Sequence, residues 1–423
     1  MRAISKNLIQ FCRENNISLC DYIARWRGEL KVKAQHAKAL ASIVAVTLAF
    51  FLSAPMASAS KNSRPSWTFM VYLDADNSLD SFGPINLQQM SDGLALGASV
   101  NVVVLMDRLN LPAYVYEVTH QQIKTVQSLG EVDMGSPETL TSFAMFAMKT
   151  YPATRFFLDL WDHGGGCTGV CWDESSGHHL SPHDVEKAVA LAESSVKKHV
   201  QVVGFDACMM GMVEVCYELK DVTDVVVGSE IVIPGYGWPY TQLMAYLCNY
   251  PTADAYNLSS ELVKEYVAFY PRSTVQLSAI NEASIPDLTE SLDSFANTLK
   301  GNVYAYQGVI AGARGDAQQE FILGTGGSYF YIDLSRFAQL VGERGGNATV
   351  EALSEDLRNE LDVAVFAEAH TAQLGNLDAK EFGLTINFPP NIQVYSARYE
   401  ADVPCFVQET SWLSFLIAYY SSM

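Results

Sequence analysis

Short apolar runs, rich in β-branched and aromatic residues, recur along most of this chain and alternate with segments of helical periodicity. Several runs are apolar on both faces, as expected of strands inside a sheet that helices cover on both sides. The alternation predicts an α/β fold with a mostly parallel sheet and helices on both faces. The predicted strands cover residues 67–75, 99–107, 113–119, 155–162, 200–207, 222–229, 273–280, 328–334 and 383–388.

The helical segments indicate how the chain is divided. Residues 181–199 begin with Ser-Pro, have carboxylates early and end with a Lys pair, which matches the helix dipole. Residues 212–220 and 257–270 are further predicted helices, and the pattern becomes more helical after about residue 285. We therefore expect an α/β domain over 60–285. A C-terminal subdomain over 286–423 is expected to pack on it and contribute strands to the same sheet.

The N-terminus has the features of a secretory signal. Several Arg and Lys precede an apolar stretch over residues 39–54, and the sequence Ala57-Ser58-Ala59 follows as a small-x-small cleavage pattern. We predict a signal peptide over 1–59 and a secreted or periplasmic protein. The apolar stretch is short for a spanning helix, but the long basic region before it leaves an uncleaved membrane anchor as the alternative.

The chain is strongly acidic. Its net charge is −20, and loss of residues 1–59, with eight basic and three acidic residues, changes it to −25. Such a surface repels nucleic acid and anionic membranes and attracts cationic substrates. The alternative is that the acidity serves only solubility. We expect no nucleic-acid partner and a monomer.

Two predicted strands end on reactive side chains. Residues 155–162 lead into His163 and three glycines, and residues 200–207 lead into Cys208. One predicted helix joins the two strands, so they should be parallel and neighbouring, with both side chains at the same sheet edge. Ligands of open parallel sheets bind at this edge.

A thiol beside a histidine is the requirement for a cysteine nucleophile. We expect a helix to begin at Met209, so that its N-terminus lowers the pKa of Cys208. The amides of Gly164 and Cys208 are candidates for an oxyanion hole. The alternative is a buried core cysteine and a structural histidine.

The sequences WDHGGG, from residue 161, and DACMMGMVE, from residue 206, resemble the histidine and cysteine motifs of the clostripain family of cysteine peptidases, in the caspase–gingipain clan. PGYGWPY (234–240) and FMVYLDADNSLD (69–80) are similar to other segments of that family. The resemblance covers most of 66–390. It implies a caspase-like catalytic domain over 60–285, with His163 and Cys208 as the catalytic pair.

Asp206 is the candidate specificity residue. It lies two positions before Cys208 and should point to the same side of the strand. A carboxylate there would bind Arg or Lys in a charge-assisted pair, and the resemblance implies this role. The alternative is a helix cap.

Metal sites and disulfides are less well marked. We interpret Asp74–Asp80 as a turn, since it lacks the glycine and distal Glu of an EF-hand. His178, His179 and His183, with Cys167 and Cys171, fit no usual zinc spacing. Cys167 and Cys171 are instead a plausible disulfide pair. We expect no cofactor; the resemblance allows calcium, but no site for it is identified.

These observations together predict a secreted cysteine endopeptidase that cleaves protein or peptide substrates after Arg or Lys. The rival hypotheses are a caspase-like peptidase of other specificity and a non-catalytic binding protein on the same fold. No Lys or Arg occurs from Gly164 to Glu186. We therefore expect activity as one chain, or trimming near Lys61 and Arg64.

Overall fold

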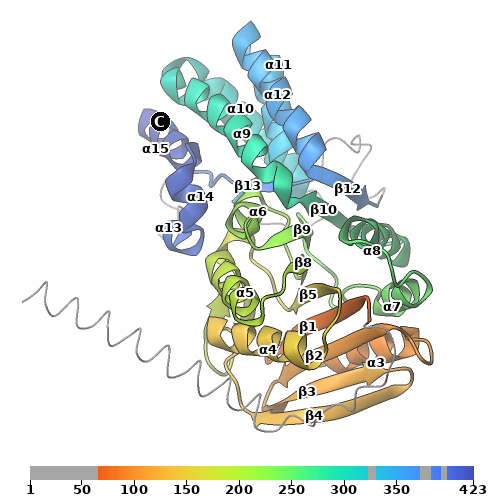
Figure 1. Cartoon of the computed structure of the whole chain (residues 1–423). Coiled ribbons are helices and arrows are strands. Elements are labelled where there is room, and N and C mark those ends of the chain that lie inside the picture. The colour runs from red at the N-terminus through yellow and green to blue at the C-terminus, as the bar shows by residue number, and fades with distance from the viewer. Residues whose placement is uncertain (1–64, 323–329, 372–382, 392–397) are drawn as a thin grey trace, which may run out of the picture.

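The computed structural model describes residues 65–322, 330–371, 383–391 and 398–423. Its centre is a nine-stranded sheet of order β12-β10-β9-β8-β5-β1-β2-β3-β4 (Figure 1). The five middle strands are mutually parallel and the outer strands antiparallel, which confirms the predicted α/β class. The parallel strands are β1 (Trp67–Ala75), β2 (Val100–Arg108), β5 (Arg155–Trp161), β8 (Val200–Asp206) and β9 (Thr223–Gly228).

The outer strands lie in pairs at the two sides of the sheet. They are β3 (Leu111–Thr119) and β4 (Gln122–Gly130) at one edge, and β10 (Gln276–Asn281) and β12 (Val365–His370) at the other. β4 and β12 are edge strands with few fully buried positions, so neither shows the apolar run that marks the middle strands. Both were missed in the sequence for that reason.

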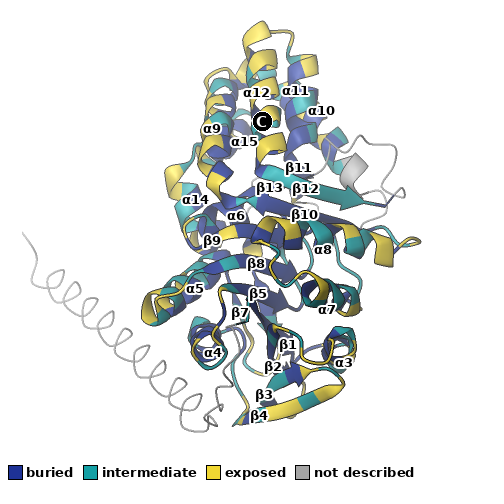
Figure 2. Cartoon of the chain, turned by 45° about the vertical axis from the view of Figure 1, so that its right-hand side comes forward, coloured by how far each residue is buried: buried dark blue, intermediate teal, exposed yellow. Residues whose placement is uncertain are grey.

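Helices cover both faces, and the middle strands are buried on both (Figure 2). One face is covered by α3 (Gly83–Gly93), α7 (Tyr240–Asn249) and α8 (Ala255–Phe269). The other is covered by α4 (Pro137–Thr150), α5 (Pro182–Val196) and α6 (Val213–Leu219). Along β1, Tyr72 faces the second set and Val71 the first, which explains the continuous apolar run.

The C-terminal third adds helices beyond the β10–β12 side of the sheet and others against α5 and α6 (Figure 1). Its helices are α9 (Ile285–Gly301), α10 (Val303–Ile322), α11 (Leu334–Gly345), α12 (Ala348–Ala364), α13 (Tyr399–Asp402), α14 (Pro404–Glu409) and α15 (Trp412–Ser422). The predicted strands near 328–334 and 383–388 shorten to β11 (Tyr331–Asp333) and β13 (Thr385–Asn387), which pair in a separate small sheet. The strand from this region that joins the main sheet is β12.

The predicted signal over 1–59 lies outside the described residues. Within the described part of the chain, no helix is both long and apolar enough to cross a membrane.

Candidate active site

His163 and Cys208 leave the sheet side by side. β5 pairs with β8 in parallel, with Trp161 opposite Asp206, and each candidate residue follows two positions later. The amide of Asp162 donates to the carbonyl of Asp206 at 3.3 Å, which continues the pairing beyond the strands. The predicted neighbouring strands are thus confirmed. Because α5 connects these two neighbouring strands, His163 and Cys208 lie at the same sheet edge although they are 45 positions apart in the sequence.

Both side chains line one pocket of about 170 Å³ at the carboxyl edge of the parallel strands. Asp206 lines the same pocket, so all three predicted side chains of the site converge there. The remaining lining residues come from the turn after β1, the end of β5 and the loop before α7: Leu79, Trp161, Asp162, Ile233, Pro234, Gly235 and Gly237.

The ring of His163 is oriented by a serine that was not identified from the sequence. Ser78 Oγ lies 2.9 Å from His163 Nε2. With that nitrogen engaged, Nδ1 is the nitrogen left for another partner. Burial lowers the pKa of His163, partly countered by Glu174, so the imidazole is neutral near pH 7.

The backbone around His163 is held by the buried carboxylate of Asp162. Asn77 Nδ2 donates to Asp162 Oδ1 at 2.6 Å, and the Trp172 amide donates to Oδ2. Asn77 and Ser78 belong to the Asp74–Asp80 segment; its first two residues end β1, and the rest forms the turn that was predicted after the first strand. The segment also carries two polar side chains to the loop after β5 that contains His163, the histidine loop. This second role depends on the tertiary fold, and no residue spacing in the sequence predicts it.

Cys208 is half-buried, and its thiol faces the backbone of the loop before α7. The amide of Ile233 donates to Cys208 Sγ at 3.2 Å. Burial raises the pKa of the thiol, and the amides of Ile233 and Gly164 oppose this only in part. The free site therefore holds a neutral thiol beside a neutral imidazole.

The predicted helix N-terminus at Cys208 is wrong. Met209 has a left-handed backbone (φ 62°), and α6 begins only at Val213. Instead of entering a helix, the amides of Met209 and Gly211 donate to the carbonyls of Ile231 and Ser229. The turn at Cys208 and Met209 provides no helix dipole to lower the pKa of Cys208.

Gly164 lies directly against the nucleophile. A Cβ atom at this position would lie 2.1 Å from the carbonyl oxygen of Cys208, so no side chain fits. The close approach places the Gly164 amide next to the thiol, where its hydrogen bond lowers the pKa of Cys208.

Asp206 is buried at one side of the pocket. Its Oδ2 accepts from the Trp238 amide at 2.8 Å and from the Tyr240 hydroxyl at 2.9 Å, while Oδ1 has no hydrogen bond. The same hydroxyl lies 2.7 Å from Asp159 Oδ2. Burial raises the pKa of Asp206 to about 7. No helix follows that it could cap, so the helix-cap alternative is wrong.

The predicted disulfide is also wrong, since Cys167 and Cys171 are both free buried thiols. Cys167 Sγ lies 3.5 Å from the hydroxyl of Tyr331, and Cys171 has a left-handed backbone (φ 56°). The short spacing suggested a bridge, but the chain turns between them into β6 (Val170–Asp173), and each thiol packs in the core.

The three histidines near these cysteines do not gather. His178 Nδ1 lies 2.6 Å from Asp133 Oδ2, and His179 stacks on Trp172 with ring centroids 4.9 Å apart. His183, at the start of α5, faces Glu218 instead. A zinc site shared by the three histidines is therefore excluded by their separate partners.

A carboxylate cluster that the sequence did not reveal lies behind the histidine loop. One oxygen each from Asp76, Glu131 and Asp173 lies within 4.8 Å of the others. Asp76 is fully buried, and its Oδ1 has no hydrogen bond. Three carboxylates from three segments converge here.

The C-terminal third fastens the segment that follows Cys208. Glu214 Oε1 accepts from the Asn387 amide at 2.8 Å and from the Tyr399 hydroxyl at 2.9 Å. The amide of Thr385 donates to the carbonyl of Gly211 at 3.0 Å. The Tyr331 hydroxyl donates to the carbonyl of Gly165 in the histidine loop.

Comparison with known proteins finds similarity to cysteine peptidases of the clostripain family. The model of the clostripain family (Peptidase_C11) matches residues 71–418. Clostripain of Hathewaya histolytica is 26% identical over 228 residues, which is 44% of this chain and 42% of clostripain. The chain thus matches less than half the length of that curated relative.

Solved structures show the same fold. A secreted C11 cysteine protease from Bacteroides thetaiotaomicron, bound to an irreversible peptide inhibitor, superposes with a TM-score of 0.59 at 19% identity, covering 83% of this chain and 99% of that one. An inactive zymogen C11 protease from Parabacteroides distasonis gives 0.58 at 18% identity, covering 84% and 99%.

Proposed function

The chain belongs to the clostripain family of cysteine peptidases, and on that footing we propose that it is a secreted endopeptidase that cleaves after Arg or Lys. One observation carries the proposal: His163, Cys208 and Asp206 reach a single pocket from two paired strands. The arrangement supplies a nucleophile, a base and a carboxylate for a basic side chain.

In the proposed acylation step, Cys208 Sγ attacks the scissile carbonyl as its proton passes to His163. Ser78 occupies Nε2, so Nδ1 is the accepting nitrogen. The raised pKa of Cys208 and the lowered pKa of His163 describe a neutral resting pair, so the proton moves when substrate is bound. The imidazolium then protonates the leaving amine, and water, deprotonated by His163, hydrolyses the thioester.

The amides of Gly164 and Cys208 are the proposed oxyanion donors. Gly164 packs directly against the Cys208 backbone, where a Cβ would lie 2.7 Å from the Cys208 nitrogen, so the two amides lie close to the attacking thiol. Such donors act on charge that develops only in the transition state.

Asp206 is the proposed receptor for the basic side chain before the cut. Oδ2 is held by Trp238 and Tyr240, and Oδ1, without a hydrogen bond, is available to a guanidinium or ammonium group. A bound cation stabilises the carboxylate form and offsets the cost of burial that raises its pKa. Arg gains more than Lys wherever two parallel hydrogen bonds can form.

Calcium, which the family resemblance allows, fits the cluster of Asp76, Glu131 and Asp173. Calcium prefers oxygen ligands, and the buried Oδ1 of Asp76 lacks any other partner. An ion held there would offset two of the three carboxylate charges and would hold the turn that carries Asn77 and Ser78 toward His163. No chemical step passes through it.

Secretion through residues 1–59 is part of the same proposal. The Bacteroides thetaiotaomicron protein of the same fold is described as secreted. N-terminal sequencing of the exported protein is expected to begin at Ser60. Retention of the full chain in the membrane fraction would instead support the anchor alternative.

Fluorogenic peptides that differ only at the residue before the cut test the activity directly. We expect turnover of the Arg and Lys peptides, none of the Leu peptide, and loss of turnover with iodoacetamide or in Cys208→Ala. Turnover by Cys208→Ala would refute the nucleophile. Equal turnover of the Leu peptide would favour a peptidase of other specificity, and no turnover of any peptide would favour the binding-protein hypothesis.

A further inference from the structure

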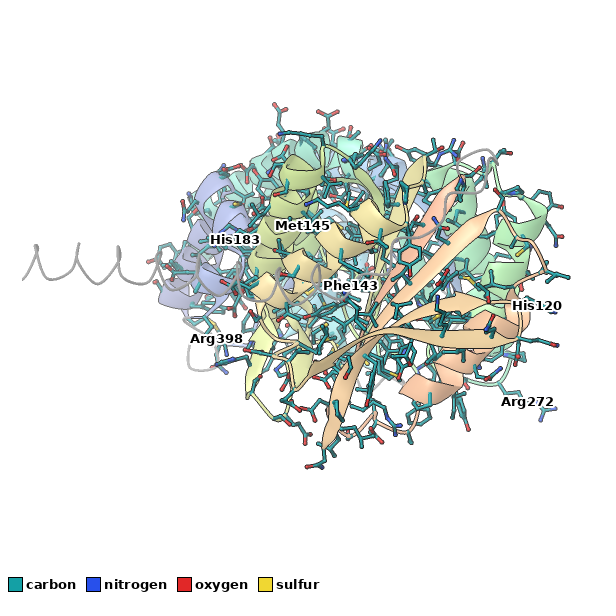
Figure 3. The ribbon with its side chains drawn as sticks, turned by 60° about the horizontal axis from the view of Figure 1, so that its bottom comes forward. His120, Phe143, Met145, His183, Arg272 and Arg398 are labelled. Carbon is teal, nitrogen blue, oxygen red and sulfur yellow. The ribbon has the colours of Figure 1, made fainter. Side chains whose placement is uncertain are left out.

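Three side chains with nitrogen, oxygen and sulfur donors meet away from the pocket, where α5 and α6 contact the C-terminal helices. They are His183 in the first turn of α5, Glu218 near the end of α6, and Cys405 in α14. One donor atom from each lies within 4.8 Å of the other two. Figure 3 labels His183 at this junction.

Glu218 is fixed by one oxygen and open at the other. Its side chain is fully buried, and Oε1 accepts from the Phe406 amide at 3.0 Å. Oε2 has no hydrogen bond. A buried carboxylate oxygen that accepts no well-aligned hydrogen bond is costly, and Oε2 lies beside His183 Nδ1, an atom that can also bind a cation.

His183 and Glu218 are close but do not form a hydrogen bond. Nδ1 lies 3.0 Å from Oε2, yet neither atom has a partner of acceptable hydrogen-bond geometry. An ordinary His–Glu pair aligns the N–H with the oxygen. His183 Nδ1 and Glu218 Oε2 lie side by side without pointing at each other, which is how two ligand atoms of one metal ion are arranged.

The donor set matches zinc. His nitrogen, Cys sulfur and a carboxylate oxygen are its usual protein ligands, at about 2.0–2.3 Å in a tetrahedron. This geometry places ligand atoms roughly 3.3–3.7 Å apart. The three atoms here lie within 4.8 Å of one another, so small side-chain rotations bring them to the distances that zinc requires. Glu186 Oε2, 3.7 Å from His183 Nδ1, or a water can take the fourth position.

We propose that His183, Glu218 and Cys405 bind Zn²⁺ and thereby clamp α14 to α5 and α6. On binding, the thiol of Cys405 loses its proton to solvent, and neutral His183 binds through Nδ1 with its proton on Nε2. Without metal, burial and the neighbouring Glu218 keep the pKa of Cys405 near 11, so the group is a thiol. The clamp is independent of the proposed peptidase activity.

Cobalt titration tests the site, because Co²⁺ takes the place of Zn²⁺ and a cobalt–thiolate bond gives a near-ultraviolet charge-transfer band. The protein is the full chain with Cys208→Ala, which removes the thiol of the proposed active site. We expect one Co²⁺ per chain, a thiolate band, and its loss when one equivalent of Zn²⁺ is added. Zn²⁺ alone should raise the Tm.

Variants assign the ligands. Cys405→Ser should abolish the thiolate band and the rise in Tm, and His183→Ala should weaken Co²⁺ binding by at least about tenfold. Cys248→Ser, which removes a half-buried thiol from α7, is the matched control and should change neither. Absence of the band, its persistence in Cys405→Ser, or its loss in Cys248→Ser would overturn the proposal. If Cys405→Ser does not fold, unchanged Co²⁺ affinity in His183→Ala refutes it equally.

Discussion

Replacing Asp206 with Asn separates the charge of the specificity pocket from its shape. The Asn carbonyl can keep the bonds from Trp238 and Tyr240, and its amide takes the position of the unpaired Oδ1. The fold should therefore survive. Because a buried carboxyl is replaced by a neutral group, the free energy of unfolding above pH 7 should stay the same or rise.

The expected loss of activity follows from removing one partner of a buried charge pair. That costs about 2–4 kcal/mol, or roughly 30- to 1,000-fold in kcat/KM for Arg and Lys peptides, at about 1.4 kcal/mol per tenfold change. The pKa of Asp206 near 7 adds a pH signature. The carboxylate form of Asp206 increases with pH. The preference of the wild type for Arg and Lys peptides should therefore grow from about pH 6 to 8, and the variant should show no such increase.

The assay compares peptides with Arg, Lys or norleucine before the cut, over that pH range. The rate of Cys208 alkylation by iodoacetamide shows whether the nucleophile is intact; it should not fall, because the charge of Asp206 contributes to the raised pKa of Cys208. Asp159→Asn is the matched control: Asp159 is equally buried, contacts the same Tyr240 hydroxyl and does not line the pocket. An unchanged Arg preference in Asp206→Asn, or an equal loss in Asp159→Asn, would refute the reasoning.

Four further outcomes are expected. Cys208→Ala should abolish turnover in the peptide assay, whereas Cys248→Ala, in α7, should keep it. Ser78→Ala should lower kcat about tenfold with little change in KM, because it removes a bond that orients the histidine; an unchanged kcat would exclude this role. Glu214→Ala should lower the free energy of unfolding by about 2–4 kcal/mol in urea titrations, since it removes the buried acceptor of the Asn387 amide and the Tyr399 hydroxyl, and Glu214→Gln should lower it much less. A denaturing gel with N-terminal sequencing should show no cut between residues 165 and 187: the first basic residue there, Lys187, lies inside α5, and a cut absent from Cys208→Ala would contradict this.

What the sequence predicted well was the part set by local pattern and chain connectivity. Apolar runs joined by one helix placed β5 beside β8, and so placed His163 beside Cys208. The predictions that failed depended on backbone detail. The local sequence around Met209 does not predict its left-handed backbone or the hydrogen bond from Gly211 to Ser229. Because of these two features, α6 begins only at Val213.

Contacts made across long stretches of chain were also beyond the sequence. Ser78 reaches His163 over 85 residues, and Cys405 reaches Glu218 from the far end of the chain. The pattern around Ser78 indicates only a turn, which is correct locally. Its role depends on the order of strands in the sheet, which brings the end of β1 next to the end of β5.

The hydrogen bonds from β13 to the segment after Cys208 also bear on when the molecule can become competent during its synthesis. The carbonyl of Gly211 and the carboxyl of Glu214 accept hydrogen bonds from Thr385 and Asn387, which lie 174 and 173 residues downstream. A nascent chain that already holds the histidine and the cysteine therefore lacks the strand that fixes the backbone between Cys208 and α6. Synthesis must pass Asn387 before this backbone is set, so a nascent chain that stops earlier should lack the proposed peptidase activity inside the cell that makes it.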